Sequence, residues 1–245
     1  MKYTVLTLFP EITDAFFANS IMAKAIKRGV ISYQPINIRD FAYDKHKTCD
    51  DAPYGGGAGM LMLAEPLSLA IEAALGEDHG TKKVIYLSPS GKPFNQEAAK
   101  ELSAQNELIL ICGRYEGIDQ RVIDKYVDEE ISVGDYVLSS GEVAALAIID
   151  ATYRLVDSVI CADSLDEESF SGGLLEYPQF TRPEVYDSIK VPEVLLSGHH
   201  EQIRKWRLEK RVEKTLRLRP DMIKQGRELG LFNKEINGII DRLTT

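Results

Sequence analysis

The sequence predicts an α/β protein with a mostly parallel sheet, followed by a small all-helical region. Short apolar segments alternate with helix-like segments over the first 156 residues, a pattern typical of strand–helix units. After residue 180 the pattern is helical throughout, with Pro183, Pro192 and Pro220 as boundaries. A chain of 245 residues is one large domain or two smaller ones, with ample material for a core.

The elements follow from periodicity. Apolar segments predict strands at 3–9, 31–38, 83–88, 107–112 and near 129–133. Helix-like periodicity covers 11–28, 65–75, 95–104, 117–126 and 141–156. Asn95 is a predicted N-cap, because its side chain suits the start of a helix. The acidic stretch 158–175 has no clear period, and we place the domain boundary there.

Composition excludes several classes of protein. No run of about 18 apolar residues occurs, so no membrane span is predicted. The start, MKYTVLTLFPE, lacks the basic and apolar regions of a signal peptide. Cys49, Cys112 and Cys161 lie far apart without a CxxC motif, which predicts neither disulfides nor a zinc site. We expect a cytoplasmic protein with reduced thiols and no metal centre.

The charge is unevenly distributed. The net charge of −9 argues against a nucleic-acid partner, but residues 199–220 carry eight Lys or Arg against three Glu. A local basic segment on an acidic protein can still hold a phosphate backbone. Alternatively, the segment is a solvated helix with ion pairs between neighbouring turns. Trp206, within it, is expected to anchor a core rather than stack on a base.

Residues 112–142 contain two glycine-bearing loops, each after a predicted strand. Loops at the carboxyl ends of neighbouring strands form the crevice in which α/β proteins bind ligands. The glycines allow tight turns and close approach to a ligand. Glycine spacing alone favours two ordinary strand-to-helix turns. The polar residues favour a site, because they crowd the loops: Arg114, Tyr115, Glu116, Asp119, Arg121, Asp135 and Glu142.

The segments CGRYEGID (112–119) and SVGDYVLSSGE (132–142) resemble the cofactor loops of the bacterial tRNA (guanine-N1)-methyltransferases. The likeness covers almost the whole chain, including LTLFPE (6–11), SIMAKAIKRG (20–29), DDAPYGGGAGM (50–60), GLLEYPQFTRPEVY (173–186) and VLLSGHHEQIRKWR (194–207). It implies methyl transfer from S-adenosyl-L-methionine to N1 of the guanine immediately 3′ of the anticodon, which maintains the reading frame. It also implies the SPOUT fold, with a deep C-terminal trefoil knot that periodicity cannot reveal.

The resemblance implies an organisation as well. Residues 1–160 would form the knotted S-adenosylmethionine-binding domain, 161–180 a linker carrying the catalytic carboxylate, and 181–245 a helical tRNA-binding domain. The expected partners are tRNA and a second copy of the chain, with neither DNA nor a membrane. In this family the active site lies at the dimer interface, where the linker of one subunit reaches the cofactor loops of the other.

Three loops correspond to the family's cofactor pocket. Their backbone groups would read the adenine edge, while Leu87, Val137 and Leu138 flank its faces. Without the resemblance, YLSP (86–89) is an ordinary strand end and turn. Ser140 stands where the family usually has glycine, which would cost about 1 kcal/mol if φ had to be positive. The implied cofactor residues are Tyr86, Leu87, Ser88, Pro89, Gly113, Tyr115, Glu116, Gly117, Ser132, Val133, Gly134, Asp135, Tyr136, Val137, Leu138 and Gly141.

Methylation of guanine N1 requires a base for the N1 proton and a cation for the charge that builds on O6. The family motif places Arg154 as the cation, although an ion pair with Asp150 is the simpler explanation of that residue alone. The base corresponds to Glu168, where the family usually has Asp. Glutamate has a similar intrinsic pKa and is one methylene longer. Asp166 and then Glu167 are the alternative bases.

The resemblance also implies substrate-binding residues. Asp50, Tyr54, Gly55, Gly56 and Gly57 would line the approach to a flipped guanine, although adjacent glycines are equally typical of a flexible surface loop. In the basic segment the implied tRNA contacts are His199, Arg204, Lys205 and Arg207. The family's magnesium dependence points to an acidic residue such as Glu116. His46, His199 and His200 have no metal-ligand partners at useful spacing.

Two other functions stay open. A non-enzymatic RNA-binding relative is supported by Ser140 and Glu168, which depart from the family pattern. A nucleotide-dependent enzyme using GGGAGM (55–60) is disfavoured, because that segment lacks the Lys-Ser/Thr of a phosphate-binding loop. LTLFPEITDAF also has no GxGxxG motif after the first strand.

Overall fold

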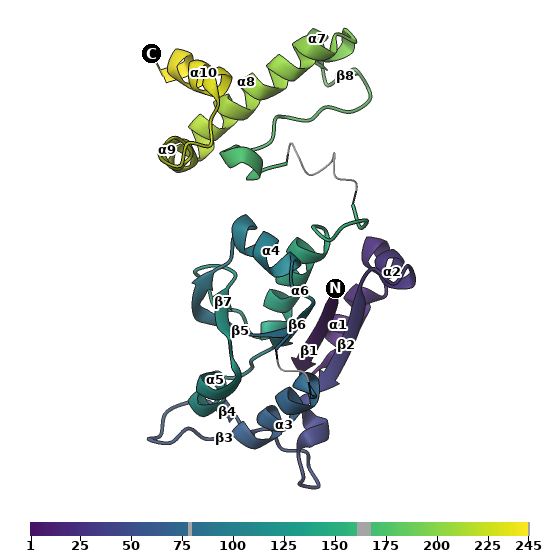
Figure 1. Ribbon diagram of the computed structural model, residues 1–245, viewed down its shortest axis with the longest axis vertical. Helices are drawn as coiled ribbons and strands as arrows, with labels where there is room; N and C mark the ends of the chain where they lie inside the picture. Colours follow the sequence, from purple (N-terminus) through teal and green to yellow (C-terminus); the bar gives the residue numbers. More distant parts are fainter. Residues whose placement is uncertain (78–79, 161–167, 245) are drawn as a thin grey trace. The chain divides into compact units, whose positions relative to one another are not determined.

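The computed structural model describes residues 1–77, 80–160 and 168–244. Its tertiary contacts divide the chain into two compact units, Met1–Ile160 and Cys161–Thr245 (Figure 1). Within the described ranges, no helix combines the length and the apolar character needed to cross a membrane.

The first unit is built on a parallel sheet, as predicted. Its strand order is β2-β1-β6-β5-β7, and each neighbouring pair runs in parallel. The strands are β1 (Lys2–Thr7), β2 (Ser32–Asn37), β5 (Lys82–Pro93), β6 (Glu107–Ile111) and β7 (Glu129–Ser132). A short antiparallel pair, β3 (Asp50–Asp51) with β4 (Leu61–Met62), was not predicted.

Alternating side chains along the strands build a core on each face of the sheet. On one face, Tyr3 and Leu108 pack under α1 (Pro10–Phe17), α2 (Ser20–Lys27), α4 (Gln96–Ser103) and α6 (Gly141–Tyr153). On the other face, Leu6 and Ile109 pack under η1 (Ile38–Phe41), α3 (Ala64–Leu75) and α5 (Gln120–Tyr126). The result is a three-layer α/β arrangement (Figure 1).

The largest differences from the predicted boundaries occur at two places, and α5 also begins three residues later and α6 ends three residues earlier than predicted. The helix predicted over 11–28 is wrong as one element, because Ser20 has a φ of +61° and separates α1 from α2. The strand predicted at 83–88 continues to Pro93, with a break in register between Leu87 and Lys92. The N-cap prediction is confirmed, since the Asn95 side chain accepts a hydrogen bond from the Ala98 N–H at 3.0 Å.

The second unit is mainly helical. It contains η3 (Ser171–Gly173), α7 (Glu193–Leu196), α8 (His200–Leu218), α9 (Pro220–Glu228) and α10 (Lys234–Thr244). Its core joins Leu174 to four side chains from the helices and their connections: Val212, Ile223, Phe232 and Ile240. Arg211 of α8 donates hydrogen bonds to the carbonyls of Ser171 and Leu175, at 2.9 and 3.2 Å, which fixes the segment before the helices.

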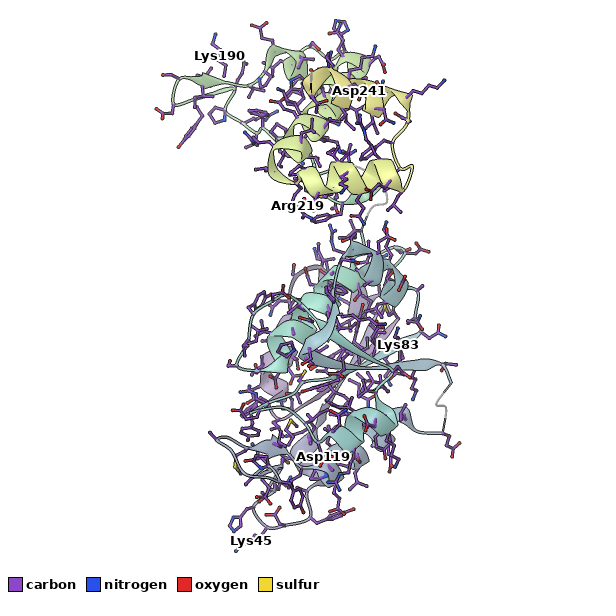
Figure 2. The ribbon with its side chains drawn as sticks, turned by 90° about the vertical axis from the view of Figure 1, so that its left-hand side faces the viewer. Lys45, Lys83, Asp119, Lys190, Arg219 and Asp241 are labelled. Carbon is purple, nitrogen blue, oxygen red and sulfur yellow. The ribbon has the colours of Figure 1, made fainter. Side chains whose placement is uncertain are left out.

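The prediction of an entirely helical region after residue 180 is wrong at one hairpin. Strands β8 (Val185–Tyr186) and β9 (Ile189–Lys190) are joined by Asp187 and Ser188, whose φ values are +48° and +64°. A two-residue hairpin of this kind requires positive φ at both positions. The hairpin that carries Lys190 projects from the helices of the second unit (Figure 2).

Two helical glycines of the second unit are expected to respond oppositely to alanine. A Cβ at Gly226 would overlap the Phe232 ring. Although alanine has the better helix propensity, Gly226→Ala should therefore lower the free energy of unfolding of the second unit by about 1–3 kcal/mol. A Cβ at Gly238 of α10 would meet no atom within 4 Å, so Gly238→Ala should stabilise it by about 0.5–1 kcal/mol. Urea unfolding of both variants checks the pair, and equal shifts of the midpoint would contradict the packing argument.

Candidate active site

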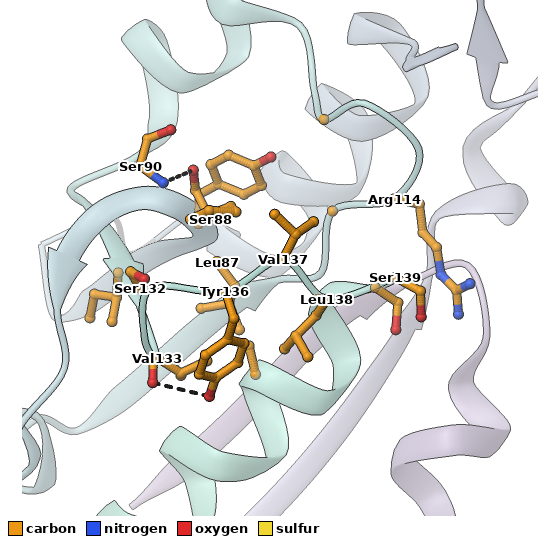
Figure 3. Close-up of a pocket in the computed structure, with 18 of the residues that line it drawn as sticks. Leu87, Ser88, Ser90, Arg114, Ser132, Val133, Tyr136, Val137, Leu138 and Ser139 are labelled. Atoms are coloured by element: carbon orange, nitrogen blue, oxygen red, sulfur yellow. Dashed lines mark hydrogen bonds between the residues drawn. The ribbon is translucent and has the colours of Figure 1, made fainter. Parts of the chain in front are cut away.

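A cavity of about 300 Å³ lies at the carboxyl ends of β5, β6 and β7, beside the start of α6 (Figure 3). Three loops line it: 86–90, 113–117 and 132–141. All the implied cofactor residues except Asp135 contribute to the lining. The three loops therefore meet at one edge of the sheet, because each lies toward the carboxyl end of a parallel strand. Residues not assigned to this pocket from the sequence also line it: Ser90, Arg114, Ile131, Ser139, Ser140 and Ala144.

The cavity combines apolar walls with backbone polar groups. Leu87, Val137 and Leu138 lie around the same space in Figure 3. Local hydrogen bonds shape the third loop, because the Tyr136 hydroxyl donates to the Val133 carbonyl at 3.2 Å and the Ser132 hydroxyl to the Gly134 carbonyl at 3.0 Å. Such a lining suits a flat, uncharged ring system held between aliphatic side chains.

Gly141 brings two of the loops into backbone contact. Its N–H donates to the Gly113 carbonyl at 2.9 Å. A Cβ at this position would lie 2.7 Å from the Cys112 Cα and from the Gly113 nitrogen, so only glycine fits without a shift. The neighbouring Ser140 has extended backbone, with φ −164° and ψ 152°. Ser140 therefore causes no backbone strain of the kind that a positive φ would have caused.

Two tyrosines frame the second loop. Tyr86 is buried, and burial, followed by the charge of Glu130, raises the pKa of its phenol. Tyr86 packs beside Gly113, where a Cβ would lie 2.9 Å from its ring. Tyr115 adopts a φ of +57°, a rare conformation for a bulky residue. Its pKa is raised by burial first and then by the neighbouring Asp50 carboxylate. A residue expected to bind substrate thus acts electrostatically on the second loop.

Backbone hydrogen bonds attach the second loop to residues 59–62. The Glu116 N–H donates to the Met60 carbonyl and the Met62 N–H to the Gly117 carbonyl, both at 3.0 Å. In the glycine run 55–57 every φ is positive, and no atom lies within 4 Å of the added Cβ positions. Tyr54 beside the run is fully exposed. The expected guanine-approach segment is thus an open loop, and the residues that follow it are bonded to the second cavity loop.

A buried ion pair lies behind the cavity. Arg114 Nε is 3.4 Å from Glu142 Oε2, and the Glu142 side chain is inaccessible to solvent. The Thr7 hydroxyl of β1 donates to the other carboxylate oxygen. The Arg114 guanidinium also lies 4.4 Å from the centre of the Phe9 ring. Burial raises the pKa of the adjacent Cys112 thiol, and the charge of Glu142 adds to the rise, so this thiol stays neutral.

The comparisons with known proteins agree with one another. A family model described as tRNA (guanine-1)-methyltransferase TrmD matches residues 1–225. The chain belongs to this family. Proteins named tRNA (guanine-N(1)-)-methyltransferase are similar over nearly their whole length. The one from Treponema denticola is 64% identical over 98% of each chain. The one from Borreliella burgdorferi is 59% identical over 91% of this chain and 92% of its own. The one from Treponema pallidum is 53% identical over 99% and 96%.

The two residues expected to be catalytic, Arg154 and Glu168, lie outside the cavity lining. Arg154 caps the carboxyl end of α6, whereas Gly141 at the other end lines the cavity. A helix of this length, 13 residues, separates the two ends by about 20 Å. Glu168 belongs to the second unit and is half-buried, and its carbonyl accepts a hydrogen bond from the Ser171 N–H at 3.1 Å. The alternative bases Asp166 and Glu167 lie outside the described residues.

Basic side chains of the segment 199–220 form ion pairs with neighbouring glutamates. Arg204 binds Glu201 and Glu235, with contacts of 3.0 and 2.9 Å, and both partners raise its pKa. Lys205 lies 3.6 Å from Glu201, and the Arg207 guanidinium lies 4.7 Å from the centre of the Tyr177 ring. His199 occupies the position before α8. Trp206 is half-buried beside Phe180, with ring centroids 6.3 Å apart, and is not part of the buried core.

The described residues contain no group of three or more His, Cys, Asp or Glu side chains that could hold a metal ion. Glu116 lines the cavity as a single carboxylate. A single carboxylate fits the chemistry of Mg²⁺ in one respect, because Mg²⁺ usually keeps several waters and binds through one or two carboxylates and its substrate.

Proposed function

We propose that this protein transfers a methyl group from S-adenosyl-L-methionine to N1 of the guanine immediately 3′ of the anticodon of tRNA, and thereby maintains the reading frame. The observation that carries the proposal is the convergence of three loops on one cavity in a chain of this family. The ends of parallel strands are the usual ligand site in α/β proteins.

The cavity fits the adenosyl part of the methyl donor. Its volume of about 300 Å³ lies at the lower end of the range of small-molecule sites. Leu87 and Leu138 would flank the adenine ring, and backbone groups of the three loops would read its edge. Bound S-adenosylmethionine would supply an electrophilic methyl group on a sulfonium. Glu116 would be the protein ligand of any Mg²⁺ in the site.

The protein's own side chains would manage protons and charge. Glu168 would accept the N1 proton of guanine, since a carboxylate within hydrogen-bond reach acts as a general base. Arg154 would meet the negative charge that develops on O6. Asp50, Tyr54 and the glycines 55–57 would hold the flipped base, so that N1 faces the methyl carbon in line with the sulfur.

A homodimer accounts for the position of Arg154. In one chain this residue lies a whole helix length from the cavity, so a second copy must supply the cation if Arg154 acts there. Apolar side chains beside the cavity would be covered by such a partner: Tyr136 is 56% exposed, Val137 85% and Val143 54%. The SPOUT trefoil knot, formed by the same loops, is part of this proposal, as is the division into a cofactor domain, a linker and a tRNA-binding domain.

The basic face of α8 would hold the tRNA backbone. His199, Lys205 and Arg207 are the residues we expect at phosphates, together with Arg204 if it exchanges a glutamate for a phosphate. Exchange of this kind is favourable in low salt, because phosphate contacts release counterions. No contact to DNA or to a membrane is part of the proposal.

Methyl transfer to a tRNA transcript tests the function. The assay uses labelled S-adenosylmethionine and a tRNA with guanine 3′ of the anticodon, with the same transcript carrying adenine there as the control. We expect label in the first transcript alone, with N1-methylguanine as the product after digestion. A protein that binds the tRNA but neither transfers label nor takes up S-adenosylmethionine in calorimetry would instead be a non-enzymatic RNA-binding relative.

A further inference from the structure

We propose that Arg114 and Glu142 are positioning residues that set the separation of two cavity walls, and that cofactor binding closes the contact between them. The inference rests on the proposed use of the cavity for S-adenosylmethionine. It assigns a role to two residues that line or flank the cavity without belonging to the expected cofactor set.

The pair links the second loop to the start of α6. Arg114 belongs to the second loop, between Gly113 and Tyr115, whereas Glu142 lies in the first turn of α6, directly after the third loop. The guanidinium of Arg114 points away from the middle of the cavity (Figure 3). The same walls are joined in the backbone by the Gly141 N–H bond to the Gly113 carbonyl. A side-chain contact and a backbone hydrogen bond thus join the second loop to the start of α6.

The carboxylate of Glu142 is fixed from behind. Its Oε1 atom accepts a hydrogen bond from Thr7 at the end of strand β1, and the side chain has no solvent access. A carboxylate buried in this way requires a cation, because an uncompensated buried charge is strongly destabilising. Arg114 is the partner that the structure provides. Glu142 is therefore held from β1, and Arg114 is the side whose position follows that of the second loop.

The contact between Arg114 and Glu142 is longer than a charged hydrogen bond. Arg114 Nε and Glu142 Oε2 are 3.4 Å apart, and neither atom has a hydrogen-bond partner among the described residues. Charged N–H to carboxylate bonds usually span about 2.7–2.9 Å. A movement of the second loop by about 0.5 Å toward α6 would therefore satisfy both buried atoms. A ligand that contacts both loops and favours this movement gains the free energy of the bond that forms.

An aromatic contact favours a planar cation at position 114. Phe9 lies under the Arg114 guanidinium at 4.4 Å, and Arg39 lies near the same ring at 5.8 Å. A planar guanidinium can stack on a ring and donate in its plane at the same time, whereas an ammonium cannot. Lysine at position 114 would keep the charge but lose this alignment.

Glu142→Gln and Arg114→Lys test the proposal. Glutamine keeps the shape and an acceptor for Thr7, and lysine keeps a cation beside Glu142, so folding is retained in at least one variant. We expect KM and Kd for S-adenosylmethionine to rise about tenfold in each, with kcat at saturating cofactor changed less than about threefold. A purely structural role would lower the active fraction, and hence kcat, and leave KM unchanged.

Glu107→Gln is the matched control. Glu107 is also buried, accepts a hydrogen bond from a β1 threonine (Thr4, 2.6 Å) and pairs with a cation (Lys2, 3.1 Å), but it begins β6, at the strand end away from the cavity. It should lower the unfolding midpoint while the cofactor Kd stays at the wild-type value. If wild type binds the cofactor and the variants at 114 and 142 have an unchanged KM, the inference is wrong but the proposed function stands. Wild type without cofactor binding would overturn the proposed function.

Discussion

Glu168→Gln is expected to lower kcat for tRNA methylation by at least about two orders of magnitude, because general-base catalysis typically contributes about 10²–10⁴-fold. Glutamine is nearly isosteric and keeps a hydrogen-bond acceptor, but it cannot take the N1 proton of guanine. The Kd for S-adenosylmethionine should stay at the wild-type value, since Glu168 does not line the cavity. Single-turnover rates with saturating enzyme, together with calorimetry, measure the two effects separately.

Three neighbouring variants make this result specific. Asp166→Asn and Glu167→Gln are expected to retain most of the activity. Glu168→Asp restores the residue that the family usually has, and it should be active as well. Activity that survives Glu168→Gln and disappears in Asp166→Asn would move the base to Asp166. Loss of activity in all three charge-removing variants would indicate that the acidic segment acts by its collective charge rather than through one base.

Gly141→Ala is expected to abolish most cofactor binding. The added methyl group would lie 2.7 Å from backbone atoms of Cys112 and Gly113, so no change of side-chain rotamer can relieve the overlap. Relief of the overlap must separate the two loops, at a cost of about 1–3 kcal/mol or more. The wall separation would change with them, so we expect Kd for S-adenosylmethionine to rise at least about tenfold, measured by calorimetry.

Ser140→Gly is the control for that experiment. It introduces the residue that the family usually carries, at a position whose backbone is extended and accepts either residue. Its cofactor Kd should stay within about threefold of wild type. Equal binding by Gly141→Ala and wild type would mean that the contact between the loops is not needed for the cavity.

Much of the fold could be predicted from sequence patterns because the first unit obeys them locally. Alternating apolar runs and helical periods gave the five sheet strands and their parallel character. The break between α1 and α2 was missed, although Asn19 and Ser20 are residue types that favour helix ends. The hairpin at Asp187 and Ser188 carries no Asn-Gly or Asp-Gly signal, so its positive φ values had no clear sequence mark.

The cavity was accessible to sequence reasoning for a physical reason. Loops that follow parallel strands of one sheet lie at the same edge of it, so the glycine-bearing loops at 113–117 and 134–141, after β6 and β7, share that edge although β5 lies between the two strands. The pairing of Arg114 with Glu142 was not predictable, because it depends on how the first turn of α6 packs against the end of β1. Arg154 and Glu168 came from the resemblance alone, since neither belongs to a local pattern that indicates catalysis.

The hydrogen bonds between residues 59–62 and 116–118 would couple the two proposed substrate sites in thermodynamic linkage. Met62 and Ile118 form a parallel bridge, and Glu116 and Gly117 bond to the same short segment. A methyl donor that restrains loop 113–117 therefore also restrains the segment that leads from Asp50 and Tyr54. Linkage is reciprocal, so the factor by which the donor changes the affinity for tRNA equals the factor by which tRNA changes the affinity for the donor. Binding of the methyl donor and binding of tRNA would then be coupled through two backbone hydrogen bonds.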